Sequence, residues 1–354
     1  MLTAPRIPDR SFLAVAPAAA VGGAAWNLSH LPLGWLMGAA LVTGVVAMMG
    51  VAITVPAGLH KAALIVIGTG VGLALSPDVA VQIVTWAPVM GVAAVLGIAM
   101  AALMAPLLER FGKVDRATAY FSLLPGGVIE MANIAGRFGA DRTTIAALHT
   151  VRVALVVVLL PLALFSIFEH GPGGAASSGA ANSGWVMIAA ALAVGTFGGW
   201  LGARLHFPAA WLLGAVIAVG IASGSGEVGA KLPGGLLALA QIVVGMMLGS
   251  RFDRRRLATI PRALAVGVPV LITIIVVMAL FAALCALFMP VDLSTLVLSF
   301  AIGGMAEMVL TAKALHQDVA LVAAFQAVRG IAANALAGPI WIWLTRNRTK
   351  RTGE

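Results

Sequence analysis

Charged side chains are scarce in this chain of 354 residues. They make up 10% of it, whereas soluble domains carry about 25%, and hydrophobic residues make up 61%. So few charges cannot cover a water-facing surface of ordinary size, which excludes a soluble globular protein. Apolar stretches recur along the whole chain and are long enough, at about 1.5 Å per residue, to cross a hydrocarbon core of about 30 Å. The sequence therefore predicts an all-α polytopic membrane protein, whose first partner is the lipid bilayer.

Cysteine and clustered histidine are also missing. Cys285 is the single cysteine and lies in an apolar segment, so a disulfide framework is excluded. The histidines are scattered, with no pair at the spacing of helical metal ligands; they are His30, His60, His149, His170, His206 and His316. We therefore expect no metal site, no cofactor and no enzymatic activity.

Glycine is abundant instead. Its 41 residues are about 12% of the chain, against a usual 7%. Several pairs lie four residues apart, among them Gly34 with Gly38 and Gly245 with Gly249. Small residues at this spacing let helices approach closely in lipid. The spacing favours packing within one bundle over a dedicated dimerisation motif, and a homodimer stays open.

The chain is an internal duplication. The segment LLPGGVIEMANIAGRFGADRTTIAALHTVR at 123–152 returns 177 positions later as FAIGGMAEMVLTAKALHQDVALVAAFQAVR at 300–329, with the Gly-Gly, Glu, Asp and Arg kept. A Gly/Ala/Ser-rich stretch without Lys or Arg separates the halves. We expect a first membrane repeat at 1–168, an external linker at 169–184 and a second membrane repeat at 185–354.

The basic residues indicate that the two repeats are inverted. The loop at 76–82 has no Lys or Arg, but its counterpart at 250–262 has five. The loop at 109–116 has three, and its counterpart at 289–296 has none. Because basic loops stay in the cytoplasm, matching loops lie on opposite sides of the membrane. This assignment places both termini in the cytoplasm, explains the net charge of +9 without direct nucleic-acid binding, and predicts a multi-pass protein of the cytoplasmic (inner) membrane.

The same assignment requires two segments that enter and leave by one face. The candidates are 119–138 and 294–313, each interrupted by a Gly-Gly pair, because a broken helix can lie at membrane depth when protein or water surrounds it. The predicted fold is therefore two inverted repeats, with about ten transmembrane helices and two re-entrant, broken hairpins that carry GGxxEM. Pro125 precedes the first Gly-Gly but Ile302 precedes the second, so we expect the second hairpin to break differently.

The repeated motif places opposite charges within the membrane. Arg152 lies about ten residues into a helix predicted to begin near Thr143, and is thus about 14 Å deep. An unpaired charge there costs at least about 2.5–3.5 kcal/mol, so it needs a partner or a water-filled cavity. Glu130 is the available carboxylate, and Arg329 and Glu307 repeat the arrangement. One reading is a structural ion pair in each half. The other is a shared small-molecule site between two hairpins.

Further residues of the motif suit such a site. Asp141 and Asp318 precede the helices that carry the arginines, as N-caps do. Broken helices offer main-chain N–H groups and positive dipole ends to an anion, and a membrane Glu can carry a coupling proton. Asn334 is a further polar residue in apolar surroundings. The predicted substrate or ion-binding set is Glu130, Glu307, Arg152, Arg329, Gly126, Gly127, Gly303, Gly304, Asn133, His149 and Gln326.

The doubled G-G-x-x-E-M, at 126–131 and 303–308, each followed by a helix with Arg, resembles the membrane AbrB duplication family over nearly the whole chain. The resemblance implies two labels, transcriptional regulator and ammonia monooxygenase. Neither fits these residues. The soluble AbrB regulators are short, β-rich DNA-binding dimers, and an oxygenase of this kind needs clustered histidines for copper. The architecture is also similar to that of secondary transporters with inverted repeats, which is a likeness of fold alone.

Two functions follow as expectations. The first is a secondary transporter for a small organic anion or zwitterion, with proton or cation coupling and a site between the two hairpins. The second is a membrane-embedded regulator or sensor that acts on gene expression through a partner, bound at the basic loop 251–256 or at the C-terminal tail.

Overall fold

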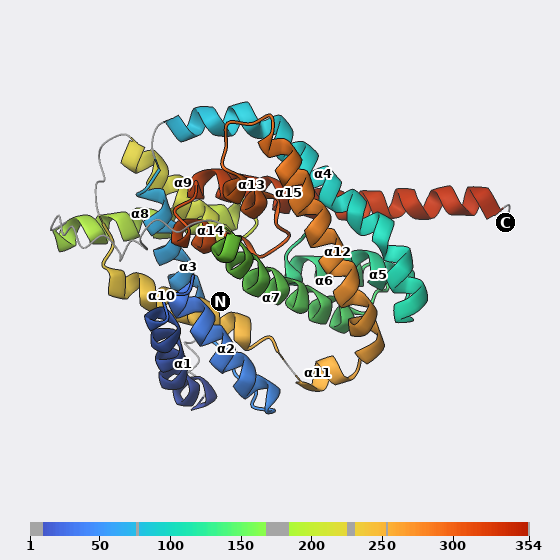
Figure 1. The fold of residues 1–354 in the computed structure, drawn as a ribbon, viewed down its shortest axis with the longest axis horizontal. Helices are drawn as coiled ribbons and strands as arrows, with labels where there is room; N and C mark the ends of the chain where they lie inside the picture. Colours follow the sequence, from blue (N-terminus) through green and yellow to red (C-terminus); the bar gives the residue numbers. More distant parts are fainter. Residues whose placement is uncertain (1–9, 76–77, 168–183, 225–230, 253, 353–354) are drawn as a thin grey trace. The chain divides into compact units, whose positions relative to one another are not determined.

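The computed structural model describes residues 10–75, 78–167, 184–224, 231–252 and 254–352. These residues form helices and no strand, so the predicted all-α class is confirmed (Figure 1). Residues 169–183 of the predicted external linker lie outside the described ranges.

Within these ranges, six helices are long and apolar enough to cross a membrane. They cover Ser11–Leu28, Val81–Gly112, Arg142–Ile167, Trp185–Arg204, Pro261–Ala286 and Val319–Arg346. Large apolar side chains along them are exposed, such as Val84 and Leu280 at 75% and 65%. An apolar surface of this extent is unusual for a protein in water and is suited to lipid. The structure therefore has the character of a membrane protein.

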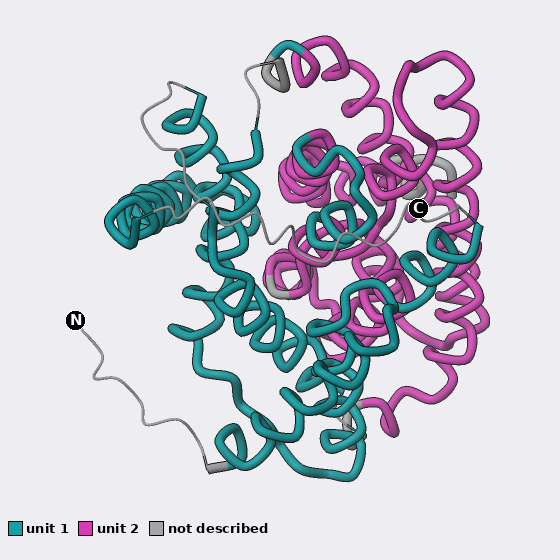
Figure 2. Tube along the Cα trace, turned by 60° about the vertical axis from the view of Figure 1, so that its left-hand side comes forward, with its two compact units in different colours: residues 1–81, 158–255, 309–320 teal, residues 82–157, 256–308, 321–354 magenta. Residues whose placement is uncertain are grey.

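The chain divides into two compact units, shown in teal and magenta in Figure 2. Unit 1 consists of residues 1–81, 158–255 and 309–320, and unit 2 of residues 82–157, 256–308 and 321–354. Each unit takes segments from both sides of the linker. The predicted boundaries at 168 and 185 describe the duplication in the sequence, and the compact units cut across it.

Unit 1 is built from six helices with close backbone contacts. They are α1 (Arg10–Leu28), α2 (Gly34–Met48), α3 (Ala57–Gly72), α8 (Trp185–Arg204), α9 (Ala210–Gly224) and α10 (Gly234–Gly249). α1 packs on α2, α8 on α9, α2 on α10 and α3 on α9. A Cβ built on Gly38 of α2 would lie 2.5 Å from the carbonyl carbon of Gly22 on α1, and one on Gly214 would lie 2.7 Å from that of Gly198. Glycine is required at these two crossings because any side chain would force the helices apart.

Unit 2 contains the two interrupted segments. Its helices are α4 (Asp78–Gly112), α5 (Arg116–Leu123), α6 (Val128–Gly136), α12 (Pro261–Ala286) and α13 (Leu293–Phe300). The first residues of α4, up to 81, belong to unit 1, and four further helices are also shared between the units, namely α7 (Arg142–Ile167), α11 (Arg254–Ala258), α14 (Met305–Ala314) and α15 (Val319–Thr352). Aromatic rings join α15 to the helices before the interruptions. Tyr120 of α5 stacks on Trp341 at 5.5 Å, and Phe300 of α13 contacts Phe325 at 5.3 Å between ring centroids.

Candidate functional site

The first interruption lies between α5 and α6, at residues 124–127. Leu124 has φ −60° and ψ 139°, so the helix cannot continue through it. The last carbonyl groups of a helix have no partner within the helix, and inside a membrane they must find one elsewhere. Arg152 of α7 is such a partner at the first break. Its Nη1 donates a hydrogen bond to the carbonyl of Leu124, and its Nη2 donates one to the carbonyl of Gly126 at 2.9 Å. The guanidinium therefore acts as a cap on the end of α5.

The second interruption, at residues 301–304, repeats this arrangement at an offset of 177. Ala301 has φ −58° and ψ 135°. Arg329 of α15 donates through Nη1 to the carbonyl of Ala301 and through Nη2 to that of Gly303 at 2.8 Å. The expectation that Ile302, in place of Pro125, would change the second break is wrong. The same Arg contacts hold both breaks, so the cap conformation does not depend on proline.

The hydrogen bonds of both guanidiniums in the described structure go to carbonyl oxygens. From the charges alone, an ion pair with Glu130 or Glu307 was one reading of the sequence. An Arg fork presents several N–H donors in one plane and can satisfy two carbonyls at once. Because the chain turns out of the helix at each break, two carbonyls of that turn lie within reach of one guanidinium. Arg152 and Arg329 are 1% and 8% exposed, so both charges are buried.

Each glutamate lies at the start of the helix that follows its break. Glu130 is the third residue of α6, and Glu307 is the third residue of α14. A Cβ built on Gly127 would lie 2.8 Å from Cδ of Glu130, and one built on Gly304 would lie 2.8 Å from Cδ of Glu307. The carboxyl group thus folds back over the N-terminus, as the third-position acid of a capping box does. A negative charge at this end is also stabilised by the helix dipole.

The other glycine of each pair makes room for the methionine of the motif. A Cβ built on Gly126 would lie 2.6 Å from Cγ of Met131, and one built on Gly303 would lie 3.0 Å from Cε of Met308. Gly127 has φ −70°, a value open to any residue, and a side chain there would meet the carboxyl group of Glu130. The G-G-x-x-E-M motif is therefore one local structure, in which the first Gly is covered by Met and the second by Glu.

His149 and Gln326 hold the two helices before the breaks in the same way. Nε2 of His149 is 2.9 Å from the carbonyl oxygen of Phe121. Nε2 of Gln326 donates to the carbonyl of Leu298, also at 2.9 Å, and to that of Ala301 at 3.0 Å. Phe121 and Leu298 are again 177 positions apart. Both side chains are buried, at 0% and 1% exposed.

In the described part of the chain, six buried polar atoms around the breaks have no hydrogen-bond partner. They come in pairs at the offset of 177 and are Nε of Arg152 and Arg329, Oγ of Ser122 and Ser299, Nδ1 of His149 and Oε1 of Gln326. Buried polar atoms in proteins are normally paired, so such a set marks a place where water or a ligand belongs. The two serines were missed from the sequence. Their signal was the offset itself, because Ser122 and Ser299 are equivalent positions.

The two breaks act on one another within unit 2. Arg152 and Arg329 are close enough for their charges to repel. α7 also reaches the second break directly, because a Cβ built on Gly303 would lie 2.9 Å from Cγ1 of Val156. Val156 is one helical turn beyond Arg152. α7 thus carries an arginine bound to the first break and a valine packed against the second.

The two asparagines lie in different surroundings. Asn133 of α6 is exposed. Asn334 of α15 is half-buried, and its side-chain oxygen is buried with no hydrogen-bond partner within the described ranges. Only Asn334 therefore shares the character of the unpaired polar atoms at the breaks.

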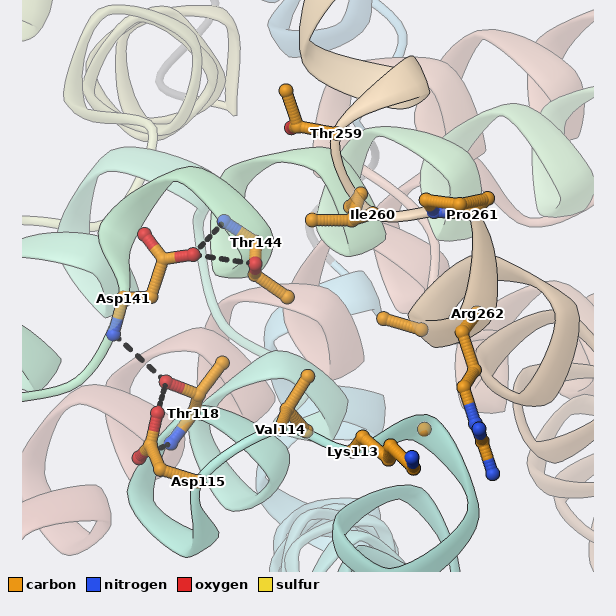
Figure 3. A pocket seen from close by; sticks show the side chains of 12 residues that line it. Lys113, Val114, Asp115, Thr118, Asp141, Thr144, Thr259, Ile260, Pro261 and Arg262 are labelled. Atoms are coloured by element: carbon orange, nitrogen blue, oxygen red, sulfur yellow. Dashed lines mark hydrogen bonds between the residues drawn. The ribbon is translucent and has the colours of Figure 1, made fainter.

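A polar cavity of about 380 Å³ lies at the start of α5, α7 and α12 (Figure 3). Asp115 accepts a hydrogen bond from the backbone N–H of Thr118 at 2.8 Å, and Thr118 Oγ1 accepts one from the N–H of Asp141 at 2.8 Å. Asp141 in turn accepts from the N–H groups of Thr143 and Thr144, at 2.9 and 3.2 Å. The predicted N-cap of the Arg152 helix is thus confirmed.

The environment of Asp141 lowers its pKa. Burial acts to raise the pKa of this carboxyl, but hydrogen bonds from Thr144 and Thr143 outweigh it and bring the pKa below its usual value. Its counterpart Asp318 lies directly before α15. Over the described ranges, no group of three or more His, Cys, Asp or Glu side chains is placed to hold a metal ion.

Apolar helices of spanning length, two interrupted helices and a buried arginine bound to each interruption define a class of helical membrane proteins. The chain belongs to the AbrB family, described as "Transition state regulatory protein AbrB", whose profile matches residues 6–345. The family resemblance drawn from the G-G-x-x-E-M repeat is therefore confirmed.

Two relatives cover most of the chain. The "Uncharacterized protein YhjN" of Bacillus subtilis (strain 168) is 29% identical over 362 aligned positions, covering 95% of this chain and 92% of its own length. The "Putative regulator AbrB" of Escherichia coli (strain K12) is 24% identical over 308 positions, covering 85% of this chain and 86% of its own.

Proposed function

We propose that the protein is a secondary transporter of the cytoplasmic membrane for a small organic anion or zwitterion. The observation that carries this proposal is the pair of buried guanidiniums, Arg152 and Arg329, which repel one another and bond to uncharged carbonyl groups. Two positive charges in apolar surroundings are stabilised by an anion that enters between them. In this proposal Arg152 and Arg329 are the substrate-binding groups, and no catalytic step is part of it.

Opposite ends of the short helices meet at each break. Each arginine covers the carbonyl groups at the end of α5 or α13, which is the negative end of the helix dipole. The positive ends of α6 and α14 begin at the same breaks, and the carboxyl groups of Glu130 and Glu307 lie over them. Paired helix breaks of this kind, with their N-termini aimed at acidic groups of a substrate, are a recurrent design of secondary transporters.

The proposed topology is two inverted repeats with both termini in the cytoplasm. The six long helices and the four shorter apolar ones, α2, α3, α9 and α10, would supply the ten crossings. The α5–α6 and α13–α14 segments would be the two re-entrant hairpins, entering from opposite faces. A site between them would then open alternately to the two sides of the membrane.

The regulator reading is favoured by one specific observation, the printed name of the Escherichia coli relative. In that reading the basic segment 251–256 or the C-terminal tail would bind a protein partner. Measurement of anion flux distinguishes the transporter from the regulator. Anion-dependent flux in reconstituted vesicles supports the transporter, whereas a partner captured from the cytoplasm by an intact chain that moves no anion supports the regulator.

A thermal-shift screen of the purified protein tests the anion site. Sodium acetate, succinate and glutamate would be compared on the wild type, Arg152→Gln and Arg329→Gln, with the exposed Arg137→Gln as control. We expect at least one of these salts to raise the unfolding temperature of the wild type and of the control, and of neither site variant. Equal stabilisation of all four proteins would contradict the proposal, because the site would not involve the two buried arginines.

A further inference from the structure

His149 and Gln326 make equivalent hydrogen bonds through different chemical groups. Both donate through Nε2 to a carbonyl group of the helix before a break, at equivalent positions of the duplication. A carbonyl oxygen only accepts hydrogen bonds, so Nε2 of His149 carries the proton in the neutral ring and Nδ1 carries the lone pair. Nδ1 is buried and has no hydrogen-bond partner among the described residues. The first half therefore has a group that can take up a proton where the second half has an amide that cannot.

Burial, first of all, and the charges nearby both oppose a proton on His149. Arg152, one turn further along α7, acts directly on the ring, and Arg329 of α15 acts on Arg152. The contacts from α5 and from the break are made by main-chain groups of Phe121 and Gly126, which carry no net charge. A proton on Nδ1 would thus be a third positive charge near the two guanidiniums, and it is disfavoured while no anion is present.

An anion at the arginines lowers the part of this cost that comes from charge repulsion. Its negative charge offsets that of the guanidiniums, so the imidazole can be protonated at a smaller electrostatic cost. Coupling of this kind is reciprocal, and a proton on His149 must tighten the binding of the anion by the same factor. The carboxyl groups of the motif, Glu130 and Glu307, fold over the starts of α6 and α14 and keep their role at those helix ends.

We propose that His149 is the proton-binding residue of the anion site, so that each anion bound between the breaks is accompanied by one proton. The inference rests on the proposed transport function and adds its coupling ion. Gln326, at the equivalent position of the second repeat, stays neutral. Of these two positions, therefore, His149 binds a proton and Gln326 does not.

Proton uptake on anion binding tests the proposal. Binding of sodium acetate, succinate and glutamate to the full-length protein in lipid nanodiscs would be measured by calorimetry near neutral pH. Two buffers that differ in ionisation enthalpy give the number of protons taken up. We expect about one proton per bound anion for the wild type and none for His149→Gln, which copies the amide found at position 326. Gln326→His should raise the uptake above that of the wild type.

The controls separate a lost proton site from a lost fold. His149→Gln retains a donor to the carbonyl of Phe121, as Gln326 does for Leu298, and its unfolding temperature should stay near that of the wild type. The exposed His316→Asn should leave proton uptake unchanged. Equal proton uptake by the wild type and His149→Gln, or anion binding without proton uptake by the wild type, overturns the role of His149 and leaves the anion site standing. If none of the three anions binds the wild type, the result contradicts both the proposed anion site and the proposed role of His149.

Discussion

At the scale of single residues, the shape of the guanidinium matters as much as its charge. Arg152 holds two carbonyl groups, those of Leu124 and Gly126, with separate nitrogens. A lysine ammonium is a point charge that cannot reproduce this fork. We expect Arg152→Lys to lose one of the two bonds and to destabilise the protein by about 1–3 kcal/mol, because a buried carbonyl loses a charged donor.

Unfolding temperatures in detergent would measure this effect. Arg329→Lys should lower the midpoint by a similar amount, since its two carbonyl partners are equivalent. Arg137→Lys, at an exposed position, is the matched control and should have little effect. A wild-type midpoint for both buried lysine variants would show that charge alone holds the breaks.

The second glycine of each pair is tied to the glutamate that covers it. Gly127→Ala would place a methyl group against the carboxyl of Glu130, and removal of that carboxyl in Glu130→Ala should relieve the clash. We expect the double variant to be more stable than the sum of the two single changes predicts, with a coupling of about 0.5–3 kcal/mol. Thermal unfolding of the four proteins of the cycle measures it.

A matched control comes from a glycine with open space around it. None of the described residues has an atom within 4 Å of a Cβ built on Gly91 of α4, so Gly91→Ala should be neutral or slightly stabilising. Additive effects at Gly127 and Glu130 would argue against the contact that explains the motif.

The sequence located these residues but did not give their partners. The offset of 177 was enough to pair Arg152 with Arg329 and His149 with Gln326, and Ser122 with Ser299 could have been found in the same way. A search for opposite charges pointed from Arg152 to Glu130. The carbonyl partners could not be read, because every residue has a carbonyl and only the local course of the chain determines which ones are left unpaired.

At the scale of helices, α7 links the polar cavity to the first break. Its N-cap, Asp141, lies in the cavity wall, and Arg152 lies on the same helix about 16 Å further along. The breaks themselves were predictable from Gly-Gly, but their equivalence was not. Ile302 in place of Pro125 suggested a difference, and the extended conformation at Leu124 and Ala301 is nevertheless the same.

The cap of α7 has a pH dependence that follows from its lowered pKa. In the folded protein the pKa of Asp141 is below its usual value, so ionisation of this group stabilises the fold above the unfolded pKa of about 4. This contribution is lost as the pH falls through the lowered folded pKa. Asp141→Asn keeps a good N-cap without the charge.

Unfolding midpoints of the wild type and Asp141→Asn between neutral and acidic pH would test this. The wild type should be the more stable of the two above about pH 4, and the gap should close at lower pH. Asp141→Ala removes the cap as well and should cost about 0.5–2 kcal/mol at every pH. If the difference between the two unfolding midpoints widened on acidification, the pKa of Asp141 would be raised in the folded protein rather than lowered.

At the scale of the whole molecule, the duplication and the compact units divide the chain differently. Unit 1 combines α1, α2 and α3 with α8, α9 and α10, and unit 2 combines both breaks with both arginines. Sequence similarity could identify the repeats because the motif is conserved between them. It could not identify the units, because these depend on which helices pack together, and the apolar residues that pack are largely interchangeable.

The inverted topology can be tested by labelling equivalent positions of the two repeats. Lys113 and Pro290 are equivalent positions, 177 residues apart, and both are exposed. If the repeats are inverted, Lys113→Cys lies on the cytoplasmic side and Pro290→Cys on the outside. In a Cys285→Ser background, a membrane-impermeant maleimide added to intact cells should label Pro290→Cys. It should not label Lys113→Cys until the membrane is opened.

Ser177→Cys and Arg254→Cys, in the predicted linker and in α11, provide a second pair. The first is expected on the outside and the second on the inside. The cysteine-free background should remain unlabelled throughout. Labelling of both members of a pair from one side would make the repeats parallel, and two hairpins entering from the same face could not form a site that opens alternately to the two sides of the membrane.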